Sequence, residues 1–251
     1  MAVEGAPGAG ATEVSRVRPR AVLMMSGGVE SAVVAALVHA HPKWRRGTVA
    51  ALLVNYGQRA LDREERAAKA VCARYGYYLE QASMRVPFWG SNSLVDPDVY
   101  ASYDPHPSAK RSHILPFRNL MILSLCAAFA EHVGEGEPVD LLTGFDFNPA
   151  NPGSARDKRP AFVKAAEQAI EASRERSEIR ILSPVQGNTK AQTVRLGEKW
   201  GVRWADTWSC YNDYRAHCGV CGSCRLRVGA FAALGRADPA GYLSAEERAG
   251  M

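Results

Sequence analysis

The stretch that decides the fold is Ala21-Val22-Leu23-Met24-Met25-Ser26-Gly27-Gly28-Val29-Glu30-Ser31. Its five apolar residues predict a buried strand, and the Ala- and Val-rich residues that follow predict a helix. The glycine pair lets the backbone turn tightly and approach a ligand, while a helix N-terminus presents unpaired N–H groups and partial positive charge. The hydroxyls of Ser26 and Ser31 add donors. The stretch predicts a phosphate-binding loop, although a plain strand-to-helix turn capped by serine is the alternative.

Short apolar runs alternate with longer stretches of helical periodicity along the rest of the chain. This alternation is typical of βα repeats around a parallel sheet, so we expect an α/β fold with flanking helices. The pattern predicts strands over residues 21–25, 49–55, 77–86, 139–143 and 179–182, and helices over 30–40, 61–75, 117–132, 159–174 and 190–200. The charges of the helix over 61–75 are interpreted as a solvated face with no more specific role.

Composition excludes several classes of protein. The chain has 251 residues, of which 47% are hydrophobic and 8% aromatic, and a formal net charge of +5. These values exclude collagen-like, coiled-coil and wholly disordered chains. No apolar run approaches the roughly 20 residues that span a bilayer, and residues 1–20 lack the apolar core of a signal peptide. We therefore expect a cytoplasmic protein without a membrane partner.

The chain divides into four predicted parts. Residues 1–19 predict a flexible extension, 20–205 a nucleotide-binding α/β domain, 206–236 a small metal-binding segment packed on that domain, and 237–251 a C-terminal tail. Two long irregular segments, 87–116 and 145–158, are rich in Pro, Asn, Ser and Asp. Long loops in a compact domain often carry function, so both are candidates for substrate contact.

Four cysteines near the C-terminus form the most specific motif, namely Cys210, Cys218, Cys221 and Cys224. Their spacing suits a tetrahedral Zn²⁺ site, with Gly219 and Gly222 allowing tight turns between ligands. Four thiolates leave no position for water, so the zinc is expected to be structural. A redox cysteine pair, an iron–sulfur cluster and ligation by His217 are the alternatives. Cys72 and Cys126 lie among apolar neighbours and are interpreted as core residues.

Residues 26–31 resemble the SGGxDS motif of the PP-loop ATP pyrophosphatases, which cleave ATP to AMP and pyrophosphate while adenylating a carbonyl or carboxyl oxygen. Glu30 stands where that family has Asp. The extra methylene matters if the carboxylate positions Mg²⁺, because this ion demands near-octahedral geometry. Retained activity, altered metal geometry and lost activity all stay open at this point.

The cysteine region is similar to that of one PP-loop family, the QueC or 7-cyano-7-deazaguanine synthase family. Residues 207–212 (TWSCYN) and 217–219 (HCG) carry this likeness, which covers roughly residues 20–232. Further matching elements are 55–59 (NYGQR), 115–119 (LPFRN), 143–144 (TG) and 188–191 (NTKA). The sequence departs from the family at Ala60, where the family has His, and over 145–156, where only Arg156 of its usual ending remains.

The resemblance implies an adenine nucleotide alpha hydrolase-like fold and an ATP- and Mg²⁺-dependent enzyme of the queuosine pathway. Its substrate would be 7-carboxy-7-deazaguanine, which is adenylated, amidated by ammonia, adenylated again and dehydrated to the nitrile. The resemblance also implies a homodimer.

The same resemblance assigns roles to residues of this chain. The expected ATP and pyrophosphate ligands are Ser26, Gly27, Gly28, Glu30 and Ser31. Lys190 and Arg118 are the expected catalytic cations, each at a helix start beside the crevice at the carboxyl ends of the strands; ordinary solvated cations are the alternative. The expected substrate-binding residues are Tyr56, Gln58, Asn119, Gly144, Asp146 and Arg156. Asp146 suits guanine-like N–H groups but equally suits a turn cap.

Two other functions remain open from the sequence. A diverged enzyme could pass the activated deazapurine to an amine of another protein or metabolite, in antiviral defence or natural-product assembly, as Glu30 and the altered 145–156 loop suggest. A non-catalytic nucleotide- or RNA-binding protein would use a surface formed by Arg203, Arg215, Arg225 and Arg227. No strongly basic stripe accompanies these arginines, so nucleic acid is not the expected partner.

Overall fold

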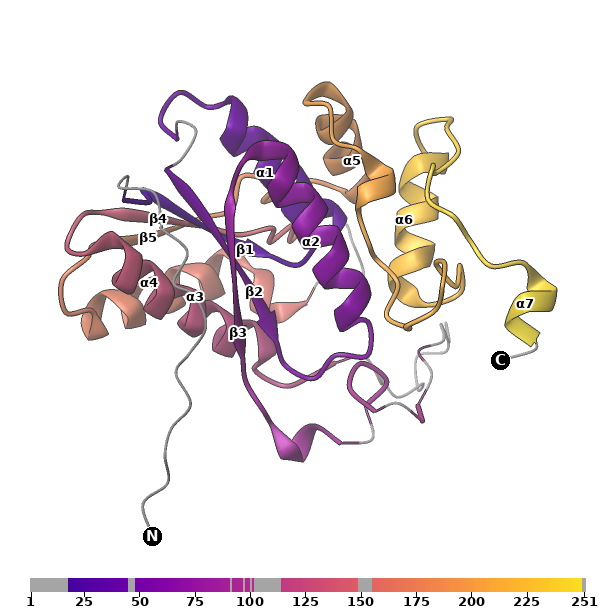
Figure 1. Cartoon of the computed structure of the whole chain (residues 1–251), viewed down its shortest axis with the longest axis horizontal. Helices are drawn as coiled ribbons and strands as arrows, with labels where there is room; N and C mark the ends of the chain where they lie inside the picture. Colours follow the sequence, from indigo (N-terminus) through magenta and orange to yellow (C-terminus); the bar gives the residue numbers. More distant parts are fainter. Residues whose placement is uncertain are drawn as a thin grey trace, which may run out of the picture.

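One parallel sheet of five strands organises the protein. The computed structural model describes residues 18–44, 48–90, 92–96, 98–99, 101, 114–148 and 155–249, so nearly all of the predicted N-terminal extension lies outside the described residues. The strands are β1 (Ala21–Met25), β2 (Val49–Asn55), β3 (Tyr78–Ser83), β4 (Val139–Leu142) and β5 (Ile179–Leu182). Their order across the sheet is β3-β2-β1-β4-β5 (Figure 1).

Strand β1 lies at the centre of the sheet and pairs in parallel with β2 and β4. Ala21 is in register with Val49 on one side and Asp140 on the other. Leu23 packs into one hydrophobic core and its neighbour Val22 into the opposite core. Because both faces are buried, the strand has no polar face, which is why its sequence is apolar throughout.

Helices cover both faces of the sheet. The helices α1 (Val29–Ala40), α2 (Leu61–Tyr75) and α5 (Lys190–Lys199) pack on one face, and α3 (Arg118–Gly134) and α4 (Pro160–Ser173) on the other (Figure 1). The predicted α/β fold with a parallel sheet is confirmed. Because all strands run the same way, the loops after them gather at one edge, where ligands bind in folds of this kind.

Strand β3 is shorter than the sequence predicts. The prediction of 77–86 is wrong at both ends, because the ladder pairs Ala50 to Asn55 of β2 with Tyr78 to Ser83 of β3. Strand β2 ends at Asn55, whose carbonyl accepts a hydrogen bond from the Met84 backbone N–H at 2.8 Å, and the ladder stops there. The chain continues into the short 3-10 helix η1 (Pro87–Trp89). Hydrophobic pattern alone does not report where a partner strand ends.

The C-terminal part contains helices that the sequence reading missed. After α5 the chain passes the 3-10 helix η3 (Trp204–Asp206) and forms α6 (Gly222–Ala232), which begins directly after Cys221, and then α7 (Ala245–Ala249). Phe231 of α6 joins the core that contains α1 and α5. The cysteine segment is thereby fixed to the sheet domain.

Arg227 fastens the last residues to this segment. Its guanidinium is fully buried and pairs with Asp238 at 2.7 Å and 3.1 Å, and it also donates to Thr207 Oγ1 at 2.8 Å. Asp238 in turn accepts a hydrogen bond from the Tyr242 hydroxyl. A buried charge is tolerated when it is paired in this way. Residues 237–243, expected as part of a tail, therefore pack on the cysteine segment.

No helix in the described part of the chain has both the length and the apolar character that crossing a membrane requires.

Gly197 provides a test of the packing between α5 and α1. A Cβ at this position would overlap the Trp204 ring and lie 2.8 Å from Val33 Cγ2. We expect Gly197→Ala to lower the free energy of unfolding by about 1–3 kcal/mol, as overpacked cores do, measured by urea denaturation. The matched control is Gly229→Ala in α6, where an added Cβ meets nothing within 4 Å. That change should stabilise by about 0.5–1 kcal/mol, since alanine is the better helix former. Equal effects of the two substitutions would contradict this packing.

Candidate active site

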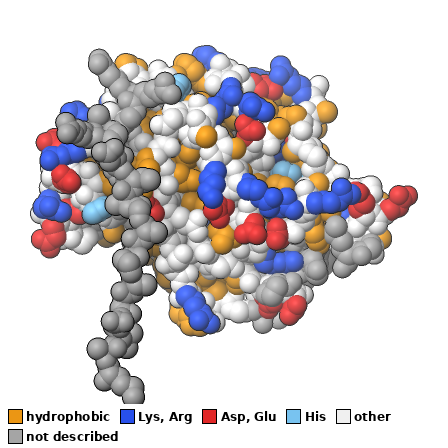
Figure 2. All heavy atoms as spheres, viewed as in Figure 1, with side chains coloured by type: hydrophobic (Ala, Val, Ile, Leu, Met, Phe, Trp, Pro, Cys, Tyr) orange, Lys and Arg blue, Asp and Glu red, His pale blue; other side chains and the backbone are white. Residues whose placement is uncertain are grey.

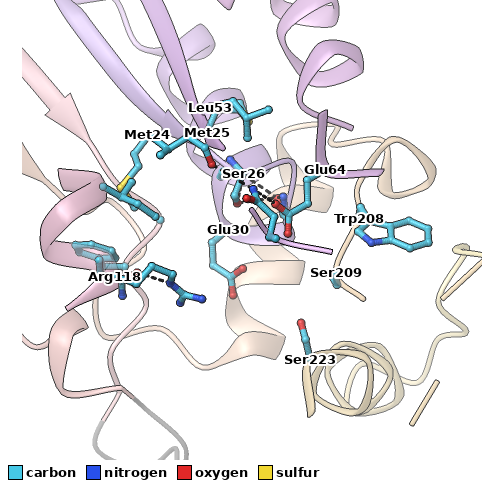
Figure 3. A pocket seen from close by; sticks show the side chains of 18 of the residues that line it. Met24, Met25, Ser26, Glu30, Leu53, Glu64, Arg118, Trp208, Ser209 and Ser223 are labelled. Atoms are coloured by element: carbon cyan, nitrogen blue, oxygen red, sulfur yellow. Dashed lines mark hydrogen bonds between the residues drawn. The ribbon is translucent and has the colours of Figure 1, made fainter. Parts of the chain in front are cut away.

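A cavity of about 210 Å³ opens at the carboxyl ends of β1 and β2. Its wall is formed by the loop after β1, by the first residues of α1, α3 and α5, and by residues 208–211 of the cysteine segment (Figure 3). Segments far apart in the sequence thus meet at the edge of the sheet where the loop was predicted to bind phosphate.

The phosphate loop is braced by its own hydroxyls. Ser26 and Ser31 hydrogen-bond through their Oγ atoms at 3.2 Å, and Ser31 also donates to the carbonyl of Gly28 at 3.1 Å. Gly28 is the N-cap of α1 and supplies no side-chain cap. The first turn of α1 therefore keeps N–H groups and partial positive charge available beside the cavity, an arrangement that favours an anion.

Gly27 fits a position that no other residue could occupy without strain. Its φ is +69°, and a Cβ there would lie 2.7 Å from Ala67 Cβ and 2.7 Å from the carbonyl oxygen of Glu64, both in α2. On the other side, the backbone N–H of Trp208 donates to the Gly27 carbonyl at 2.9 Å. The loop is held between α2 and the cysteine segment.

Two ion pairs lie at the cavity. Glu30 of α1 pairs with Lys190, the first residue of α5, and Asp146 pairs with Lys158 at 2.9 Å. Burial acts to raise the pKa of Asp146, but the ammonium groups of Lys158 and Lys190 outweigh it and lower this pKa to about 2. Asp146 therefore stays ionised at neutral pH and fixes Lys158.

Arg118 and Asn119, the first two residues of α3, present polar groups to the same cavity. The Arg118 guanidinium lies 5.7 Å from the centre of the Tyr56 ring. Burial raises the pKa of Tyr56 to about 12, so its hydroxyl stays protonated. Asn119 is 5% exposed, and its Nδ2 has no hydrogen-bond partner among the described residues. A buried donor without a partner is costly, which suits it to a ligand.

Gln58 links the loop after β2 to α2. Its Oε1 accepts from the Tyr56 backbone N–H at 2.8 Å, and its Nε2 donates to Glu64 Oε2 at 2.9 Å. Glu64 also lines the cavity, and burial raises its pKa to about 7. The interpretation of the charges on α2 as a solvated face is wrong for this residue. Its position in the first turn of a helix that begins at the ligand edge is the signal that could have identified it.

The structure places most, but not all, of the other predicted site residues at the cavity. Gly144 lines it, and a Cβ there would lie 2.8 Å from Glu30 Cβ. Asp146 does not line the cavity itself but pairs with Lys158, which does. Arg156 is exposed in the short 3-10 helix η2 (Arg156–Lys158) and does not line the cavity. The sequence reading missed several lining residues, namely Glu64, Lys158, Trp208, Ser209, Tyr211 and Ser223.

The two long loops contribute in part to this site. In the segment 87–116, Trp89 and Leu115 pack in a cluster that also contains Tyr56 and Tyr211, behind the cavity wall. In the segment 145–158, Phe145 and Lys158 line the cavity. Residues 102–113 and 149–154 of these loops lie outside the described residues.

The four predicted cysteine ligands meet in one buried cluster. Their Sγ atoms all lie within 4.8 Å of one another, and those of Cys218 and Cys224 are 3.9 Å apart. A tetrahedral ion with Zn–S bonds of about 2.3 Å places its sulfurs about 3.8 Å apart, whereas a four-iron cluster separates them further because each binds a different iron. None of the four forms a disulfide. The cluster fits a single metal ion.

His217 lies beside this cluster and is not part of it. Its Nε2 accepts a hydrogen bond from the Ser209 backbone N–H at 3.1 Å, and its ring packs 4.3 Å from that of Trp208, centre to centre. The alternative in which His217 binds the metal is therefore not supported. Instead, His217, which precedes the predicted ligand Cys218, contacts Trp208 and Ser209 of the cavity wall.

The arginine surface considered for nucleic acid does not form as a unit. Arg227 is fully buried, so its assignment to such a surface is wrong. On the face seen in Figure 2, Lys and Arg side chains are interspersed with Asp and Glu among the described residues. Interspersed charge of this kind is typical of an ordinary solvated surface.

Comparisons with known proteins agree with the sequence motifs. Residues 20–235 match the family model described as "Queuosine biosynthesis protein QueC". The 7-cyano-7-deazaguanine synthase of Chlorobaculum tepidum is 34% identical over 233 residues, which are 89% of this chain and 96% of that protein. The synthase of Methanosphaerula palustris is 33% identical over 234 residues, 89% of this chain and 99% of that protein.

Among solved structures, the U34-tRNA thiolase NcsA of Methanococcus maripaludis with its 4Fe-4S cluster is similar at a TM-score of 0.42 and 14% identity. The match covers 81% of this chain and 63% of that chain, so this protein spans less than two thirds of that structure.

Removal of one cysteine ligand tests the metal site. We expect the wild-type protein to carry one metal ion per chain and Cys221→Ser to lose it, with a marked fall in thermal midpoint, because structural metal contributes on the order of 10 kcal/mol to folding. Elemental analysis and calorimetry measure both. The control is Cys126→Ala, a core cysteine of α3 outside the cluster, which should keep the metal. Full metal content in Cys221→Ser would contradict the assignment.

Proposed function

Because the chain belongs to the QueC family of queuosine biosynthesis proteins, we propose that it uses ATP to convert 7-carboxy-7-deazaguanine and ammonia into 7-cyano-7-deazaguanine. One observation carries the proposal beyond family membership. The uncapped N-terminus of α1 and three cations from three other segments, Arg118, Lys158 and Lys190, line one cavity. A site that binds a polyphosphate and neutralises its charge needs this combination.

The reaction proceeds through two adenylations. A carboxylate oxygen of the acid attacks the α-phosphorus of ATP, and pyrophosphate leaves. Ammonia then displaces AMP and gives the amide. The amide oxygen attacks a second ATP, pyrophosphate leaves again, and loss of AMP and the N–H protons gives the nitrile. Each adenylation therefore needs a binding site for pyrophosphate, cations near the α-phosphate and a correctly oriented carboxyl or amide group of the substrate.

We assign the pyrophosphate to residues 26–31. The hydroxyls of Ser26 and Ser31 and the backbone N–H groups at the start of α1 would donate to it. Gly27 gives the loop its backbone shape and is assigned no contact with the pyrophosphate. Lys190 and Arg118 would neutralise the charge that develops on the transferred phosphate, and the ion pair with Glu30 holds Lys190 in place. Mg²⁺, when bound, would supply further charge neutralisation, and Glu30 is the carboxylate of the loop that could hold it.

We assign the deazapurine to the side of the cavity formed by Tyr56, Asn119 and Gly144. The free Nδ2 of Asn119 would donate to a ring or carbonyl acceptor of the substrate, and Gln58 keeps Tyr56 oriented. Lys158, fixed by Asp146, would meet the substrate carboxylate. We assign no contact to Arg156, since Lys158 occupies the cavity in its place.

We propose a structural Zn²⁺ for the cysteine cluster, because four thiolates close the coordination shell and leave no position for substrate. Family resemblance also leads us to expect a cytoplasmic homodimer. The acceptor is taken to be ammonia; transfer to an amine of a protein or metabolite is the second candidate, favoured by the departure of residues 145–156 from the family pattern.

Product analysis tests the proposal and separates the two candidates. The purified protein is incubated with ATP, Mg²⁺, 7-carboxy-7-deazaguanine and ammonia, and the products are identified by mass spectrometry. We expect AMP, pyrophosphate and the nitrile. Formation of AMP without amide or nitrile would point to another acceptor. No AMP from a folded, metal-loaded protein would contradict an adenylating function.

Lys190 provides a test of the charge assignment. We expect Lys190→Met to lower kcat for AMP formation by about 10²–10³, as loss of one electrostatic donor does in other enzymes. The control is Lys199→Met, which removes an exposed ammonium at the other end of α5 and should leave kcat within a factor of two. Similar rates for the two variants would rule out a special role for Lys190.

A further inference from the structure

We propose that Glu64 is the general base of the site, the group that takes the N–H protons when ammonia and then the amide react. The inference rests on the proposed function and adds a catalytic residue to it. Family resemblance gave no role to this residue, and the sequence pattern suggested an ordinary solvated charge. The pairing of Glu64, its position and its protonation behaviour support the new assignment.

The first is the pairing of the carboxylates. Of those at the cavity, Glu30 is paired with Lys190 and Asp146 with Lys158. Glu64 makes no ion pair within 4 Å among the described residues, and its recorded side-chain partner there is the neutral amide of Gln58. An ammonium partner would hold a carboxylate in its ionised form and weaken it as a base. Glu64 is free of that constraint.

The second is position. The backbone of Glu64 contacts Gly27 of the phosphate loop, where a Cβ would lie 2.7 Å from the Glu64 carbonyl oxygen. Figure 3 shows the Glu64 side chain beside Ser26. The carboxylate therefore lies at the cavity, beside the loop assigned to pyrophosphate; Gln58 donates to its Oε2, and its Oε1 has no partner among the described residues.

The third is protonation behaviour. Burial raises the pKa of Glu64 to about 7, and the hydrogen bond from Gln58 and the charge of Arg118 oppose this rise. The groups around it are Arg118 of α3, Tyr56 after β2, whose hydroxyl stays protonated, and the hydroxyls of the phosphate loop. A base whose pKa lies near the working pH both accepts and releases protons efficiently.

The chemistry requires such a group at each nitrogen step. When ammonia attacks the acyl adenylate, the C–N bond forms, the C–O bond to AMP breaks, and one N–H proton passes to Glu64. After the amide oxygen has displaced pyrophosphate from a second ATP, the nitrogen loses one proton to Glu64. Glu64 releases this proton to water and then takes the second one as the C–O bond to AMP breaks and the C≡N bond forms. Glu64 returns each proton to water between steps.

The test separates adenylation from dehydration. We expect Glu64→Gln to keep acid-dependent exchange of pyrophosphate into ATP within about threefold of wild type, while conversion of the carboxamide of the same deazapurine to the nitrile, with ATP and without ammonia, falls on the order of 10²–10⁴-fold. The wild-type rate of nitrile formation from the amide should rise with pH through about 7, since the base acts when ionised. In Glu64→Gln this dependence should be absent.

The matched control is Glu65→Gln, which removes the next carboxylate along α2, one that pairs with Lys69 on the surface. It should retain both activities and the pH profile. Equal loss of exchange and nitrile formation in Glu64→Gln would overturn the proposal, as would unchanged nitrile formation. A wild-type protein that forms no AMP from the acid would instead refute the proposed function on which this inference rests.

Discussion

The site depends on how Gly27 is held between α2 and the cysteine segment. The residue has a left-handed backbone, approaches α2 where no Cβ fits, and accepts a hydrogen bond from the Trp208 N–H. Strand β1 and helix α1 set the position of the phosphate loop, α2 closes it from one side, and the cysteine segment closes it from the other. The loop can present a preformed anion site because its shape is fixed before a ligand arrives.

The hydrogen bond from Trp208 to Gly27 also connects the cysteine cluster to the site. His217, next to Cys218, accepts from the Ser209 N–H and packs against the ring of Trp208. Arg227 donates a hydrogen bond to Thr207 Oγ1. Residues 207–209 are therefore held at several points by later residues of the same segment. The cysteine segment is thus linked to the phosphate loop through Trp208, and α6 anchors the segment to the core.

The sequence pattern predicted those features that depend on residues close together in the chain. The strand from Ala21 to Met25, the glycine turn and the cysteine spacing are local, and the structure has each of them as predicted. The sequence could not show which side chains distant segments bring together. Glu64 looked like one charge among several on α2. Lys158 lay in an irregular loop and was not singled out, whereas Arg156 was expected to bind substrate. Arg227 looked like a surface cation because its partner, Asp238, lies in an expected tail.

Hydrogen exchange measured by mass spectrometry, in metal-loaded and metal-depleted protein, tests most directly whether the cysteine segment holds the phosphate loop. The account predicts that metal removal speeds exchange in the loop at residues 26–31 as well as in residues 207–232, while the strands β4 and β5 stay protected and show that the sheet remains folded. Faster exchange confined to residues 207–232, with the loop unchanged, would contradict it.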